Sequence, residues 1–209
     1  MTFSSYKTIG DVVKKFQINY LEEEFVSKLV FPISDYFCKD IAWVLKEGVF
    51  EDSEAAICEG LIYPVLKEIC KAYSKDFVLW SHQTFRYDDD LCGSADYILA
   101  KRSPLGKVVF DQPYCLLIEA KQDDFTEGWG QCLAEMIAAQ RLNEIPEQTI
   151  FGIVSNGKNW EFGKLQMNAF SRHPKALTIW DLEDLCAVIN DIFRQCQLQL
   201  HNTSILEYR

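Results

Sequence analysis

Residues 114–121, Tyr-Cys-Leu-Leu-Ile-Glu-Ala-Lys (YCLLIEAK), join an apolar run to two charged residues at its end. The run from Cys115 to Ile118 is typical of a strand that is covered on both faces. Side chains two residues apart in a strand point the same way, so we expect Glu119 and Lys121 on one face. Opposite charges at the end of a buried strand cost desolvation free energy unless they have partners. The stretch therefore predicts a covered strand that ends either in a functional site or in a structural ion pair at its exit into solvent.

The elements on either side of this strand alternate between helices and strands. Apolar residues at helical spacing and capping residues predict helices, whereas runs of β-branched and aromatic residues predict strands. The expected helices cover residues 8–47, 53–73, 126–142 and the segment from Asp181 onward. The expected strands cover residues 77–86, 93–101, 114–121 and a hairpin formed by 149–155 and 159–165 around Asn156-Gly157. This order indicates an α/β layer architecture.

Composition limits the class of protein. The chain has 209 residues, 48% of them hydrophobic, which suits one folded unit and excludes a disordered or fibrous chain. No apolar run is long enough to span a bilayer and the start of the chain does not resemble a signal peptide, so we expect no membrane association. The eight cysteines lie mostly in apolar segments, as in the reduced core of a cytoplasmic protein. A net charge of −10 argues against a protein that coats nucleic acid through bulk positive potential.

Asp96 is a second position that could carry chemistry. Aspartate is unfavourable inside a strand, and a turn or a strand entry explains it when it is considered alone. Adjacent strands would, however, bring Asp96 beside Glu119 and Lys121. Two neighbouring carboxylates repel unless a cation lies between them, and such oxygen ligands suit Mg²⁺. With a lysine beside them, these groups form a minimal set for metal-assisted hydrolysis of a phosphodiester.

The order of these residues carries a family resemblance. Asp96, followed by Glu119-Ala120-Lys121, resembles the PD-(D/E)XK nuclease superfamily, and within it the N-terminal nuclease domain of type I restriction enzyme R subunits. The segment 53–66 looks like the first helix of that group, and 152–162 looks like its late hairpin, in which a turn precedes a tryptophan. Gln131 matches the glutamine of the group's Q-x-x-x-Y motif.

The chain departs from that pattern at two positions. Ala95 stands where the first motif of the family has a proline, and Glu135 stands where Q-x-x-x-Y has its tyrosine. The resemblance implies a restriction-endonuclease-like α/β fold, with a mixed central sheet of about five strands flanked by helices. It places the nuclease-like domain at residues 51–209 and leaves residues 1–50 as an N-terminal helical extension.

The resemblance also implies the roles of individual residues. Such nucleases often add an acid from the first helix, where Glu54 lies near the middle of the apolar stripe and Glu59 at its edge. We therefore favour Glu54, with a capping-turn acid as the alternative explanation. Lys121 would orient or deprotonate the attacking water and stabilise the developing negative charge, and Gln131 would contact the site or the nucleic-acid backbone. The implied catalytic residues are Asp96, Glu119, Lys121 and Gln131, and the implied ligands of Mg²⁺, or of Mn²⁺ as a substitute, are Asp96, Glu119 and Glu54.

The leading interpretation is an Mg²⁺-dependent endonuclease, with DNA as the expected substrate and a restriction or defence system as its setting. Two alternatives remain open: a nuclease-fold interaction or regulatory module that no longer cuts, and an unrelated α/β domain with a solvent-facing ion pair. Lys101, Arg102 and Lys107 lie between the two motif strands and predict a basic rim. The net charge nevertheless predicts weak, salt-sensitive affinity for DNA and a protein partner or homodimer that supplies positive surface.

Overall fold

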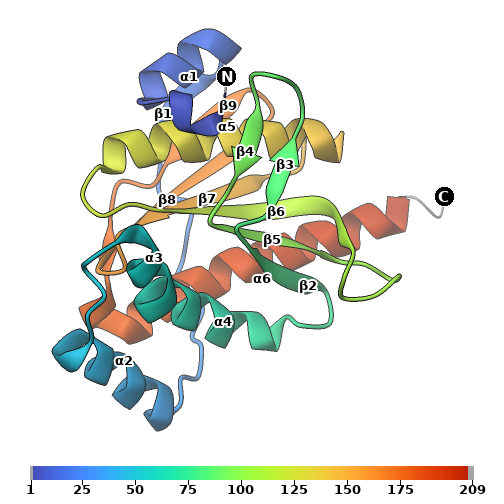
Figure 1. The fold of residues 1–209 in the computed structure, drawn as a ribbon. Coiled ribbons are helices and arrows are strands. Elements are labelled where there is room, and N and C mark those ends of the chain that lie inside the picture. The colour runs from blue at the N-terminus through green and yellow to red at the C-terminus, as the bar shows by residue number, and fades with distance from the viewer. Residues whose placement is uncertain (1, 207–209) are drawn as a thin grey trace.

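The computed structural model describes residues 2–206 and shows a mixed β-sheet between two layers of helices (Figure 1). The sheet has eight strands in the order β1-β9-β8-β7-β6-β5-β2, with β10 paired to β8. Strand β6 runs parallel to β7 and antiparallel to β5, which makes the sheet mixed. The strands are β1 (Asn19–Glu22), β2 (Phe77–Ser81), β5 (Tyr97–Arg102), β6 (Phe110–Ala120), β7 (Ile150–Ser155), β8 (Asn159–Gln166), β9 (Ala169–Arg172) and β10 (Leu177–Thr178). The expected mixed α/β fold is confirmed, with eight strands instead of about five.

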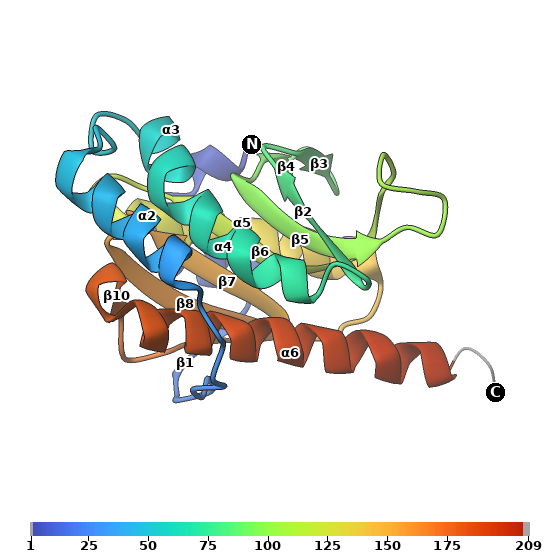
Figure 2. The ribbon, with the colours of Figure 1, turned by 90° about the horizontal axis from the view of Figure 1, so that it is seen from below.

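Helices cover both faces of the sheet. Helices α1 and α5 lie on one face, and α2, α3, α4 and α6 lie on the other (Figures 1 and 2). The α-helices are α1 (Ile9–Phe16), α2 (Asp35–Glu47), α3 (Glu54–Ile57), α4 (Tyr63–Ala72), α5 (Phe125–Asn143) and α6 (Leu182–Leu206), and 3₁₀ turns occupy η1 (Phe3–Ser5) and η3 (Ile179–Asp181). A hydrophobic core fills the space on each side, so β6 is covered on both faces, as its apolar run predicts.

The N-terminal fifty residues differ from the expected helical extension. Helix α1 ends at Gln17, whose φ of 56° is left-handed, and Asn19–Glu22 then pairs in parallel with β9 at the edge of the sheet. Helix α2 follows on the opposite face, capped by the Ser34 hydroxyl. The segment 1–50 therefore contributes a strand to the main sheet and contacts both layers. The proposed domain boundary after residue 50 stays a prediction.

Two other expected elements are interrupted. The helix predicted for residues 53–73 is continuous in direction, but its middle turn, η2 (Cys58–Ile62), is a π-helix. The strand predicted for residues 77–86 is split at His82, which has a φ of 49°. Its second part, β3 (Thr84–Arg86), leaves the main sheet and pairs with β4 (Cys92–Ser94).

The burial of the cysteines agrees with the expectation from composition. All eight cysteines are free thiols, and five of them are buried. Among residues 2–206, we find no helix that is both long enough and apolar enough to cross a membrane.

Candidate active site

The β5–β6 ladder brings the two predicted carboxylates together. Tyr97, the first residue of β5, pairs with Ile118 of β6, so Asp96 lies beside the end of β6. There, the Oδ2 atom of Asp96 accepts a hydrogen bond of 2.8 Å from the backbone N–H of Ala120. The motif strands are therefore direct neighbours, as the predicted site requires.

Asp96 and Glu119 project toward the same face of the sheet. Leu117 and Ile98 belong to the hydrophobic core beneath α5, and strand alternation gives Glu119 the side of Leu117 and Asp96 the side of Ile98. Lys121 follows the same alternation, and a Cβ on Gly128 of α5 would lie 2.8 Å from the Lys121 Cγ. The three side chains thus gather beneath the start of α5.

Lys121 links three elements of the site. Its Nζ lies 3.0 Å from Oε1 of Glu119 and 3.6 Å from Oε1 of Glu54, the first residue of α3. The Ser53 hydroxyl accepts a hydrogen bond from the Ala56 backbone N–H and caps that helix, so the helix begins at Glu54. Glu119 is only 2% exposed, which contradicts the alternative of a solvent-facing ion pair. Glu54 is about half exposed and stands at the mouth of the site.

Burial and neighbouring charges have opposing effects on the pKa values of the site residues. Burial raises the pKa of Glu119 and the nearby Asp96 charge raises it further, while Lys121 acts against both effects. Burial also raises the pKa of Asp96, against the Ala120 N–H, His82 and Lys121, which stabilise its anion. For Lys121, burial favours the neutral amine, but Glu119, Glu54 and Asp96 together outweigh burial and raise its pKa. The ammonium form of Lys121 is therefore the stable one at neutral pH.

Helix α5 carries a further acid into the interior. Gln131 is buried and its amide donates a hydrogen bond of 3.2 Å to Oε1 of Glu135. Glu135 is completely buried, and burial, followed by the Glu119 charge, raises its pKa well above the usual value of 4.5. Sequence reasoning noted Glu135 only as a departure from a motif. The signal that could have identified it is a lone acid within the apolar run 132–139.

His82 is the other residue of the site that sequence reasoning missed, because the segment 77–86 that contains it was expected to be one continuous strand. It lies instead in the break after β2 and is 58% exposed at its side chain. Its Nδ1 lies 3.4 Å from Oδ1 of Asp96, and its backbone N–H donates to the Asp96 carbonyl at 2.8 Å. No pattern around residue 82 signals this placement, which depends on the left-handed turn that ends the strand.

The donor set fits a hard cation in its chemistry. The Oε2 atom of buried Glu119 has no hydrogen-bond partner, although its Oε1 contacts Lys121. A carboxylate oxygen of this kind is the ligand that Mg²⁺ prefers, and Mg²⁺ commonly keeps several waters while binding one or two carboxylates. Within residues 2–206, no group of three or more His, Cys, Asp or Glu side chains is already arranged around a metal position.

The expected basic rim is wrong. Asp96 precedes the start of β5, whereas Lys101 and Arg102 form its far end, about 17–20 Å away along an extended strand. Arg102 there donates to the Ser74 carbonyl at 2.5 Å. Lys107 lies in the loop beyond that end. The error arises because residues that link two antiparallel strands lie at the opposite end of the ladder from the site.

Comparisons with known proteins identify no relative by sequence: no family model and no curated protein matches the chain. Among solved structures, one match is the type IIG restriction endonuclease BpuSI, with a TM-score of 0.42 and 14% sequence identity. The match covers 73% of this chain but only 17% of that enzyme. At this level of similarity it assigns neither a family nor an activity to the chain.

Proposed function

We propose that the chain is a metal-dependent nuclease that hydrolyses phosphodiester bonds of DNA. The observation that carries this proposal is the buried Glu119 carboxylate, which has the Lys121 amine 3.0 Å away and Asp96 on the neighbouring strand. Burying such charges costs free energy, and strongly shifted acids with a charged neighbour are typical of catalytic sites.

In this proposal, Asp96 and Glu119 hold Mg²⁺ or Mn²⁺, and Glu54 contributes from the start of α3. The bound metal would activate a water and stabilise the negative charge that develops on the phosphate. Glu119 is suited to this role because its unpartnered oxygen is fixed in place by the contact of its other oxygen with Lys121.

The protonated Lys121 has a defined task. Because Glu119 and Glu54 raise its pKa against the effect of burial, Lys121 carries a proton in the metal-free protein. In this proposal the protonated amine orients the attacking water, donates to a phosphate oxygen and stabilises the negative charge that develops there. Gln131 is buried and donates to Glu135, and its contact with the site or with the nucleic-acid backbone stays a prediction.

Cleavage of supercoiled plasmid with added Mg²⁺ or Mn²⁺ tests this proposal. We expect the wild type to nick the plasmid only with metal, and Lys121→Ala and Asp96→Asn each to lower the rate about 100-fold. Lys107→Ala is the matched control, because it removes an exposed lysine from the distant loop. Equal cleavage by wild type and Lys121→Ala would show that the activity comes from a contaminant and would refute the proposal.

A second candidate is a nuclease-fold module that binds partners and no longer cuts. The surface next to the site favours it, because Glu51, Asp52, Asp123 and Asp124 are exposed acids that would repel phosphates. Gln122 joins two of these segments by donating to the Glu51 carbonyl at 2.9 Å. Calorimetric titration separates the candidates: absence of Mg²⁺ and Mn²⁺ binding at millimolar concentration favours the module.

A further inference from the structure

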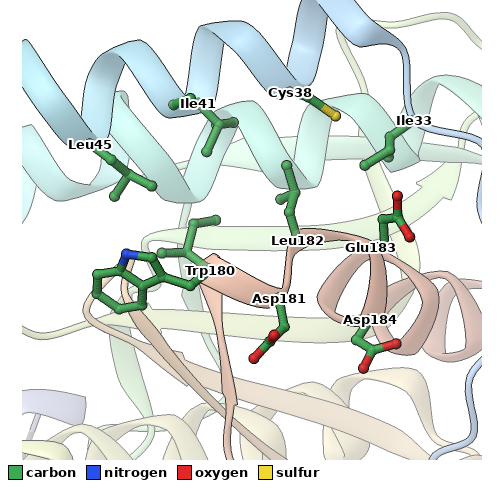
Figure 3. A pocket seen from close by; sticks show the side chains of 11 residues that line it. Ile33, Cys38, Ile41, Leu45, Trp180, Asp181, Leu182, Glu183 and Asp184 are labelled. Atoms are coloured by element: carbon green, nitrogen blue, oxygen red, sulfur yellow. The ribbon is translucent and has the colours of Figure 1, made fainter.

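A groove on the far side of the molecule from α5 separates α2 from the start of α6. It encloses about 620 Å³ between α2 on one side and η3 with the first turn of α6 on the other (Figure 3). Side chains of α2 point into it, among them Ile41 and Leu45, and face Trp180 and Leu182 across the gap (Figure 3). We call this feature the α2–α6 groove. Its walls are apolar and come from segments that are far apart in the sequence.

Large apolar side chains around the groove are open to solvent. Trp180 is 63% exposed although it forms part of the wall. Trp180 and Leu45 also line a neighbouring hollow, which continues to Val49, a valine that is 85% exposed. Tryptophan at the centre of an exposed apolar surface is typical of residues that dominate protein–protein binding. The two hollows thus share Trp180 and Leu45, and their apolar side chains lie among charged ones.

The rim of this surface is acidic. The two hollows together contain five carboxylates and one lysine. The lysine, Lys158, is paired with Glu51, and Asp184 is paired with Lys28 outside the groove at 2.6 Å. Exposed Glu183 has a carboxylate directed along the rim (Figure 3). Such a rim repels nucleic-acid phosphates and a second copy of this chain, whose net charge is −10, and it attracts a cationic partner.

We propose that the α2–α6 groove binds a basic amphipathic helix of a partner protein. The apolar face of that helix would pack against Leu45, Trp180 and Leu182, and its lysines or arginines would lie over Glu183 and the neighbouring rim acids. The neighbouring hollow extends to Glu51 and Asp52, which precede Glu54 in the chain, so a bound partner would stand near the candidate active site. The proposal depends on the groove alone and holds whether or not the chain is a nuclease.

The test uses the full chain and synthetic peptides of about 16 residues. The basic peptide places leucines at positions i, i+4, i+7 and i+11 and lysines on the other face, and a matched peptide replaces every lysine with glutamate. Fluorescence anisotropy of labelled peptide gives the affinity, and NMR shift mapping locates the contact. We expect the basic peptide to bind at least tenfold more tightly than its acidic match, with shifts at Trp180 and α2.

Variants separate this groove from general attraction to an acidic protein. We expect Trp180→Ala to weaken the basic peptide about tenfold and Glu183→Lys about fivefold. Glu147→Lys makes the same charge reversal at an exposed position outside the groove and should change affinity less than twofold. Equal weakening by Glu183→Lys and Glu147→Lys, no binding of the basic peptide at 1 mM, or groove shifts caused by a single-stranded oligonucleotide instead would each overturn the proposal.

Discussion

Replacing Glu135 with glutamine should stabilise the protein, and more so as the pH rises. Glu135 is completely buried; one carboxyl oxygen accepts from Gln131 and the other has no partner. Burial and the nearby Glu119 charge raise its pKa, so the folded state holds a proton that the unfolded state releases near pH 4.5. Glutamine has the same shape, keeps an oxygen for Gln131 and never has to ionise.

The sign and size follow from proton linkage. An acid whose folded-state pKa is raised contributes stability below its unfolded-state pKa, and this contribution is lost as pH rises toward the folded-state pKa. Between these values, the free energy of unfolding falls by about 1.4 kcal/mol per pH unit for one proton. As the pH rises from 5 to 7, the wild type should therefore lose stability relative to Glu135→Gln, at no more than this rate.

Urea unfolding at pH 5, 6 and 7, followed by tryptophan fluorescence, measures this difference. Glu147→Gln serves as the control, because it makes the same chemical change at an exposed position. A constant difference between wild type and Glu135→Gln over this range would refute the reasoning, since it would mean that Glu135 is already ionised in the folded protein.

Three further predictions concern the site and the packing of the N-terminal segment. Lys121→Met should cost about 2 kcal/mol in urea unfolding at pH 9, where Glu119, whose pKa is raised to about 8, is ionised and loses its charged partner, and less at pH 6, where Glu119 is protonated. The affinity for Mn²⁺ should rise with pH, and binding should release protons, because the metal must displace the proton that burial favours on Glu119. Calorimetry in buffers of different ionisation enthalpy counts the released protons. An affinity for Mn²⁺ that does not change with pH would contradict this prediction. Gly130→Ala should lower the free energy of unfolding by about 1–3 kcal/mol and speed proteolysis of the N-terminal segment, because the added Cβ would lie 2.6 Å from the Thr8 backbone nitrogen. Gly10→Ala is the control: its Cβ would have only a 3.5 Å contact, so the change should be neutral or stabilising.

The central elements were predictable from the sequence because their signals are local. The apolar run ending in Glu119 and Lys121 correctly predicted a covered strand with both charges on one face. Helix α5 was expected over 126–142 and covers Phe125–Asn143, because Asp124 caps it. Alternation and capping depend on neighbours in the chain, and such features suffice for these elements.

The failures have a nonlocal cause. Strand β1 was expected to be helical, and its partner begins at Ala169, 150 residues later, so no nearby residue signals the pairing. The positive φ of His82 likewise splits a segment whose composition favours one long strand, and its side chain meets Asp96 only in the folded chain. A glutamate is expected at the surface because its carboxylate is normally charged. The burial of Glu135 therefore could not be deduced from its residue type alone.

The parallel pairing of β1 with β9 means that the N-terminal segment up to residue 50 covers one edge of the main sheet. The chain leaves α1 on one face, adds a strand at the border and continues to α2 on the other face (Figure 1). A fragment that begins at residue 51 would therefore uncover the backbone groups of β9 together with the apolar surfaces beneath α1 and α2. An exposed strand edge of this kind can pair with the strands of other chains, so we expect that fragment to aggregate. We therefore expect solubility to depend on a segment that lies outside the candidate active site.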